Sequence, residues 1–144
     1  MKFIGIDPDV ERCGVGVYDA ETGELEPMAL GFFDLLDFLK KNRDEIFVII
    51  EAGWLNKKSN FHGFGGARGE RIAKNVGANH QIGKLIAEFC RREDINFKLF
   101  QPRKKKTDPV QFNKITGYSV KNQDVIDACM LVWGRKNESE FYVG

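Results

Sequence analysis

The sequence has few cysteines and histidines and no long apolar run. Its 144 residues include 3 Cys and 2 His, and the cysteines are far apart, with no Cys-x-x-Cys pair. This pattern argues against a disulfide framework and against a structural zinc site. No apolar stretch reaches the ~18 residues of a membrane-spanning helix. The chain also begins Met-Lys-Phe-Ile-Gly-Ile-Asp, which reaches a charge too early for a signal peptide. We therefore expect a cytoplasmic protein that has no membrane partner.

Internal repeats and low-complexity segments are also absent. Hydrophobic residues make up 42% of the chain and charged residues 30%, which is the composition of a globular protein. A length of 144 residues fits one hydrophobic core. We expect residues 1–144 to form a single domain.

The net charge of +1 conceals a strong separation of charge along the chain. Residues 1–52 hold 5 Lys and Arg against 12 Asp and Glu, a net charge of −7. Residues 53–121 hold 15 against 5, a net charge of +10, and residues 122–144 hold 2 against 4, a net charge of −2. A basic middle between acidic ends indicates a surface that binds a polyanion, beside carboxylates that would repel it unless cations intervene. A solvated basic face is the alternative reading.

The order of apolar runs and turns predicts a mixed α/β fold. The first third resembles an antiparallel meander of three strands, followed by a short helix that Asp34 would cap. Two later strands are each entered through a helix, so we expect them to be parallel to the first strand. The result is a five-stranded mixed sheet with helices on both faces. The expected strands are residues 2–8, 14–18, 25–33, 46–51 and 97–100, and the expected helices are residues 34–42, 70–92, 109–116 and 123–135.

Four acidic residues stand where chemistry is expected. Asp7 and Glu51 each end an otherwise apolar strand, and the carboxyl ends of adjacent parallel strands form the usual site of an α/β sheet. Asp124 and Asp127 are three residues apart at the start of the last helix, so they share a face. Taken singly, each acid could instead cap a strand, form an ion pair or complement a helix dipole. Together they form an oxygen-rich site suited to two Mg²⁺ ions, for which Mn²⁺ would substitute.

The motifs around these acids resemble a known family. The segment Ile4-Gly5-Ile6-Asp7-Pro8 is followed by Gly14-Val15-Gly16-Val17, then Ile49-Ile50-Glu51, and finally Gln123-Asp124-Val125-Ile126-Asp127-Ala128. In this order they are similar to the RuvC-type Holliday junction resolvases of the ribonuclease H-like superfamily. The resemblance covers nearly the whole chain. It implies a ribonuclease H-like fold and a site in which Asp7, Glu51, Asp124 and Asp127 bind two metal ions, with Asp7 bridging them.

The resemblance also implies a surface that binds DNA. The family has an aromatic residue three positions after the Glu, where it stacks on bases, and Trp54 has that position here. Anchoring of its own loop is an alternative role for Trp54. Family lysines that follow the fifth strand contact the scissile backbone, although no single lysine here matches them uniquely. The basic candidates are Lys57, Lys58, Arg68, Arg71, Arg103, Lys104, Lys105, Lys106 and Lys114.

These observations together predict a metal-dependent endonuclease that cuts four-way or other branched DNA during recombination and repair. The expected reaction is in-line attack of an activated water, which leaves a 5′-phosphate and forms no covalent intermediate. Symmetric cutting requires a two-fold homodimer, with residues 82–89 of the long helix as a possible contact. The sequence does not indicate whether a helicase partner exists. The alternatives are a ribonuclease H-like nuclease acting on RNA:DNA hybrids or flaps, and a catalytically silent nucleic-acid binding module.

Two glycines of the second strand have two possible explanations. Gly14 and Gly16 lack a Cβ, which would allow a nucleic-acid backbone to approach the sheet. Close packing of a helix would explain them equally well. The sequence alone does not choose between these explanations.

Overall fold

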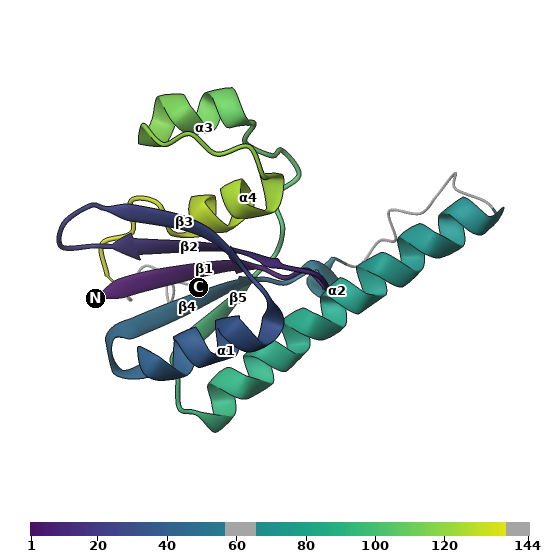
Figure 1. Ribbon diagram of the computed structural model, residues 1–144, viewed down its shortest axis with the longest axis horizontal. Coiled ribbons are helices and arrows are strands. Elements are labelled where there is room, and N and C mark those ends of the chain that lie inside the picture. The colour runs from purple at the N-terminus through teal and green to yellow at the C-terminus, as the bar shows by residue number, and fades with distance from the viewer. Residues whose placement is uncertain (57–65, 138–144) are drawn as a thin grey trace.

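A five-stranded mixed sheet forms the centre of the protein (Figure 1). The computed structural model describes residues 1–56 and 66–137, with backbone alone for residues 66–68 and 72. The strand order is β3-β2-β1-β4-β5, in which β1, β2 and β3 are antiparallel neighbours and β4 and β5 run parallel to β1. This arrangement confirms the predicted fold class. The strands are β1 (Lys2–Asp7), β2 (Cys13–Asp19), β3 (Leu25–Leu30), β4 (Ile46–Glu51) and β5 (Phe97–Phe100).

Helices cover both faces of this sheet. In Figure 1, α1 and α2 lie on one face, α4 lies on the other with α3 beyond it, and α2 projects past the sheet. No helix among the described residues is long and apolar enough to cross a membrane. The α-helices are α1 (Phe32–Lys41), α2 (Gly66–Arg92), α3 (Pro109–Thr116) and α4 (Gln123–Val132), and short 3₁₀ turns are η1 (Arg43–Glu45) and η2 (Gly53–Leu55).

Each face of the sheet carries its own hydrophobic core. Strand β4 has the sequence Ile-Phe-Val-Ile-Ile-Glu and is buried along its whole length, as its lack of alternation predicts. On one face, Val48 and Ile50 pack with Ile86 of α2, and on the other face Phe47 and Ile49 pack with residues of α4. The two cores therefore bury β4 from both faces of the sheet.

Several predicted boundaries were wrong in detail. Helix α1 begins at Phe32 with Gly31 as its N-cap, so Asp34 lies inside the first turn and caps nothing. Strand β3 ends at Leu30 and α4 ends at Val132, both three residues earlier than expected. Helix α2 begins at Gly66, four residues before the predicted start. The glycine, basic and aromatic residues of segment 53–69 predict a loop, but its last four residues already belong to α2. Residues 57–65 of this segment lie outside the described residues.

Glycines in β1 and β2 allow α4 to lie directly on the sheet. A Cβ at Gly14 would overlap the carbonyl group of Asp124, and a Cβ at Gly5 would overlap the carbonyl oxygen of Ala128. At Gly16, a Cβ would lie 2.7 Å from the Cα of Cys129. Close packing of a helix therefore explains the absence of side chains from this surface. It also fixes the height of α4 above the ends of the strands.

We predict that Gly14→Ala destabilises the protein by at least about 2 kcal/mol, because the added methyl group meets backbone that cannot rotate away. Gly77→Ala is the matched control, since Gly77 lies in α2 and a Cβ there meets nothing within 4 Å. That change should stabilise the protein by about 0.5 to 1 kcal/mol. Urea-induced unfolding of both variants measures the difference. Equal stability of the Gly14 variant and the wild type would contradict the close packing.

Candidate metal centre

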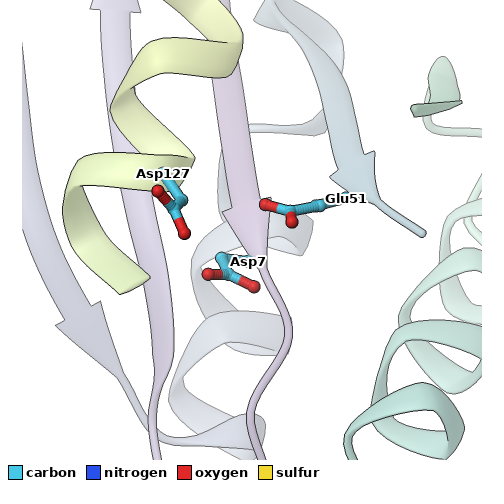
Figure 2. A group of neighbouring side chains, drawn as sticks. All are labelled: Asp7, Glu51 and Asp127. Carbon is cyan, nitrogen blue, oxygen red and sulfur yellow. The ribbon is translucent and has the colours of Figure 1, made fainter. Parts of the chain in front are cut away.

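Three carboxylates meet at the carboxyl edge of the sheet. Asp7 is the last residue of β1 and Glu51 the last residue of β4, and these strands are parallel neighbours, so both acids reach the same edge. Asp127 comes from the second turn of α4. Figure 2 shows the three side chains turned toward a common point. One oxygen from each lies within 4.8 Å of the others.

Asp124 lies beside this cluster. It is in the first turn of α4, whose N-cap Asn122 accepts hydrogen bonds from the backbone N–H groups of Asp124 and Val125. A side-chain hydrogen bond with Asp7 lowers the pKa of Asp124, although burial has a larger effect and raises it. Of the four predicted acids, the structure thus brings three into one group and places the fourth against Asp7.

Burial and mutual repulsion both act on Asp7. Burial raises the pKa of Asp7, and the charges of Glu51, Asp124 and Asp127 raise it further, to about 9. The pKa of Asp124 is also raised, by burial and by the charge of Asp9. In the metal-free protein, Asp7 therefore retains its proton at neutral pH. A bound cation would favour the ionised form of these carboxyl groups.

One lysine provides the cluster with positive charge. The Nζ atom of Lys106 lies 3.0 Å from Oε1 of Glu51 and 3.2 Å from Oδ2 of Asp127. Partial burial lowers the pKa of Lys106, but its ion pairs with Glu51 and Asp127 outweigh this effect and raise the pKa overall. The ammonium group is therefore charged and stands between two of the three grouped carboxylates.

The first residue of α4, Gln123, is hydrogen-bonded to the loop that carries Lys106. The Nε2 atom of Gln123 donates to the backbone carbonyl of Thr107 and to Oδ1 of Asp127, both at 2.8 Å. This side chain holds the backbone next to Lys106 and orients the Asp127 carboxylate. The two interactions fix the positions of the groups that form the ion pairs.

The donor set fits a hard divalent cation. All three grouped ligands are carboxylates, which Mg²⁺ and Mn²⁺ prefer. Glu51 is only 8% exposed, so its charge requires a partner. The lysine ammonium between Glu51 and Asp127 shows that a positive charge is accommodated there. Asp7, Glu51 and Asp127 could therefore hold a metal ion, with Asp124 available beside Asp7.

The predicted basic residues divide into three groups. Lys106 contacts the acidic cluster, and Arg103 and Lys105 line an open groove beside it. Three further basic residues are exposed and do not line that groove. They are Arg71 on α2, Lys104 in the loop before α3, and Lys114 on α3. Lys57 and Lys58 lie outside the described residues, and for Arg68 only the backbone in α2 is described.

Trp54 lies against helix α2. A Cβ at Gly83 would overlap its ring, His80 meets it edge-on at 6.1 Å between ring centroids, and the Nζ of Lys84 lies 6.0 Å from its centroid. The indole is half-buried, so α2 fixes its position while part of it remains open to solvent. Trp54 therefore anchors its own segment to α2, while the exposed part of its ring remains available to a ligand.

Sequence reasoning missed four residues that border the cluster. Asn79 and His80 of α2 line a second groove with Asp7 and Glu51, and Arg135 lines the groove that contains Lys106. Asp9 lies close enough to Asp124 to raise its pKa. The spacing of Val76, Asn79, His80 and Gly83 is the signal that could have identified the α2 residues, because these positions share one helical face.

The raised pKa of Asp7 predicts how stability depends on pH in the absence of metal. The unfolded chain releases the Asp7 proton near the ordinary pKa of 3.8, whereas the folded chain releases it near 9. The proton on Asp7 therefore contributes fully to the stability of the fold below pH 3.8. This contribution is lost as pH rises between these two values. Asp7→Asn removes this dependence, and at pH 8.5 in EDTA the variant should unfold several degrees above the wild type, at roughly 4 °C per kcal/mol.

Thermal unfolding of both proteins between pH 5 and pH 8.5 measures this difference. Asp37→Asn is the control, because Asp37 is exposed on α1. Parallel pH profiles for the wild type and the Asp7 variant would contradict the assigned charge state.

Comparison with known proteins gives the identity of the fold. No protein-family model and no curated protein matches the sequence. Thermus thermophilus RuvC in complex with a Holliday junction substrate is similar in structure, with a TM-score of 0.58 and 14% sequence identity over 99% of this chain and 94% of that chain. Another Thermus thermophilus RuvC structure has a TM-score of 0.48 and 16% identity, over 90% of this chain and 89% of that chain. The first likeness confirms the predicted fold, because this chain shares the fold of that RuvC structure over 99% of its length.

Proposed function

We propose that this protein is a metal-dependent endonuclease that cuts branched DNA, with four-way junctions as its main substrate. The observation that carries the proposal is the meeting of Asp7, Glu51 and Asp127 within 4.8 Å at the carboxyl edge of a RuvC-type sheet. A similar structure, that of Thermus thermophilus RuvC, contains a Holliday junction substrate. A DNA substrate also agrees with the expected cytoplasmic location.

The acidic residues would hold two Mg²⁺ or Mn²⁺ ions. When bound, such ions supply an activated water and stabilise the leaving oxygen of a phosphodiester. Asp7 interacts with each of the other three acids, and together with Glu51, Asp124 and Asp127 it would hold the ions. Gln123 would keep the Asp127 carboxylate in position through its hydrogen bond. Hydrolysis would leave a 5′-phosphate without a covalent enzyme intermediate.

The groove beside the cluster would bind the DNA backbone. Arg103, Lys105, Lys106 and Arg135 line it together with Glu51 and other residues. Cationic side chains bind phosphates regardless of base sequence, which suits an enzyme that recognises the shape of a branch. Exposed Lys104, Lys114 and Arg71 would extend this surface, and we include Lys57, Lys58 and Arg68 as candidates.

Symmetric cutting of a junction requires two active sites, and we propose a two-fold homodimer. Residues 82–89 of α2 remain the candidate contact. Leu85 in this segment is 42% exposed, so its side chain is turned away from the sheet that Ile86 packs against. An outward leucine on a helix that covers the sheet is suited to contact with a second copy.

Cleavage of labelled four-way junction, duplex, flap and RNA:DNA hybrid substrates in Mg²⁺ tests the proposed function. We expect the junction to be cut fastest. Glu51→Gln and Asp127→Asn should each reduce the cleavage rate at least about 100-fold, because each removes a charged ligand. Asp37→Asn on α1 is the control and should cleave as the wild type does.

Four outcomes would contradict the proposal. Cleavage in EDTA would exclude the metal role, and full activity of both acidic variants would exclude these ligands. Faster cleavage of the hybrid than of the junction would indicate a ribonuclease H-like activity. Binding of the junction without cleavage of any substrate would indicate a silent binding module.

Substitution of Trp54 tests whether its ring stacks on bases at the branch point. Trp54→Leu should weaken junction binding about 5- to 160-fold, since base stacking contributes about 1 to 3 kcal/mol. Trp54→Phe keeps an aromatic face and should retain most of the affinity. Binding is measured by fluorescence anisotropy in Ca²⁺, and thermal unfolding is measured in parallel. Equal binding by the Leu and Phe variants would assign Trp54 an anchoring role on α2 alone.

A further inference from the structure

The ammonium group of Lys106 stands where a metal ion would need to bind. Its Nζ contacts Glu51 at 3.0 Å and Asp127 at 3.2 Å. These two residues are also two of the three whose oxygens converge within 4.8 Å. A divalent ion held by the cluster would therefore use carboxylates that the lysine already neutralises. Two cations this close to the same oxygens would repel each other strongly.

Lys106 can leave this position without unfolding of the protein. It belongs to the loop between β5 and α3, and its side chain is 43% exposed, whereas those of Glu51 and Asp127 are each 10% exposed. The ammonium thus approaches the buried carboxylates from the solvent side, on a flexible four-carbon stem. Gln123 holds the adjacent backbone at Thr107, so rotation of the side chain alone can release the ammonium.

A phosphate bound nearby would give Lys106 a second position for its charge. The groove that Lys106 lines also contains Arg103, Lys105 and Arg135, which form the proposed phosphate-binding surface. An ammonium released from Glu51 and Asp127 would remain in this groove, where a DNA phosphate could accept it. The same lysine would then neutralise the acids before metal binds and the phosphates afterwards.

We propose that Lys106 is a built-in counter-ion of the acidic cluster, which an arriving divalent cation displaces into the groove. This inference rests on the proposed function, because it requires that the cluster binds a metal ion. It makes the binding of metal and of DNA interdependent. Metal ions would increase the positive charge available to DNA, and by reciprocity DNA would favour the metal-loaded state.

Calorimetric titration of Mg²⁺ and of Mn²⁺ into the metal-free protein tests this proposal without DNA or turnover. Lys106→Met removes the competing ammonium, so metal should bind about 3- to 30-fold more tightly than to the wild type, the range expected for losing partly exposed ion pairs. Lys105→Met is the matched control, since it removes the same charge from the same groove. Its metal affinity should change less than about 2-fold.

Thermal unfolding provides a second readout. In EDTA, Lys106→Met should unfold at a lower temperature than the wild type, because Glu51 and Asp127 lose their counter-ion. Saturating Mg²⁺ should remove most of this difference. In the Asp127→Asn background the substitution should have a smaller effect, which shows that the two residues interact. Lys106→Gln is the alternative variant if the methionine variant does not fold.

The outcomes separate this inference from the proposed function. Unchanged or weaker metal affinity in both Lys106 variants, with metal binding retained by the wild type, would overturn the counter-ion role alone. Absence of metal binding by the wild type and by every variant would overturn the proposed function and this inference with it. Equal tightening by Lys105→Met would show a general effect of charge and would also overturn the specific role of Lys106.

Discussion

The site depends on holding three carboxylates close together, which requires positive charge nearby to offset their repulsion. Asp7 and Glu51 meet because β1 and β4 are parallel neighbours that end at the same edge. Asp127 joins them because α4 lies directly on the β1–β2 hairpin, which Gly5 and Gly14 allow. The strand glycines and the helix acids therefore form one functional unit. A side chain at either glycine would raise α4 and move Asp127 from its partners.

Much of the architecture follows from short-range sequence signals. A fully apolar run identified β4 as a central strand, and apolar runs ending in Asp7 and Glu51 placed two acids at the carboxyl edge. Helix boundaries were less accurate because local preferences are weak. Asp34 is a good N-cap residue, yet α1 starts two residues earlier and carries Asp34 in its first turn. The glycines near the start of α2 likewise indicated a loop, although the helix already begins at Gly66.

The details of the site could not be predicted because they depend on distant contacts. Four consecutive basic residues follow β5, and only the path of their loop decides that Lys106 reaches the carboxylates. That path is tied to α4 through Gln123 and Thr107, which are 16 residues apart. The position of Trp54 similarly depends on Gly83 of α2, whose missing Cβ makes room for the indole. Sequence patterns identify the residue types, whereas these contacts determine which residue occupies which place.

The acidic and basic segments of the sequence meet at this edge of the sheet, where the carboxylate cluster lies beside the basic groove. Two unit charges 4 Å apart interact by about 1 kcal/mol in water and about 4 kcal/mol at the effective dielectric near a protein surface. A phosphate approaching the cluster would therefore be repelled at short range unless positive charge lay between them. The groove beside Glu51 and Asp127 is the side on which the structure provides that charge, through Arg103, Lys105 and Lys106. Under the proposed function, a polyanion would be attracted to the groove and would reach the carboxylates only once their own charge is neutralised, so that cations would bind before DNA.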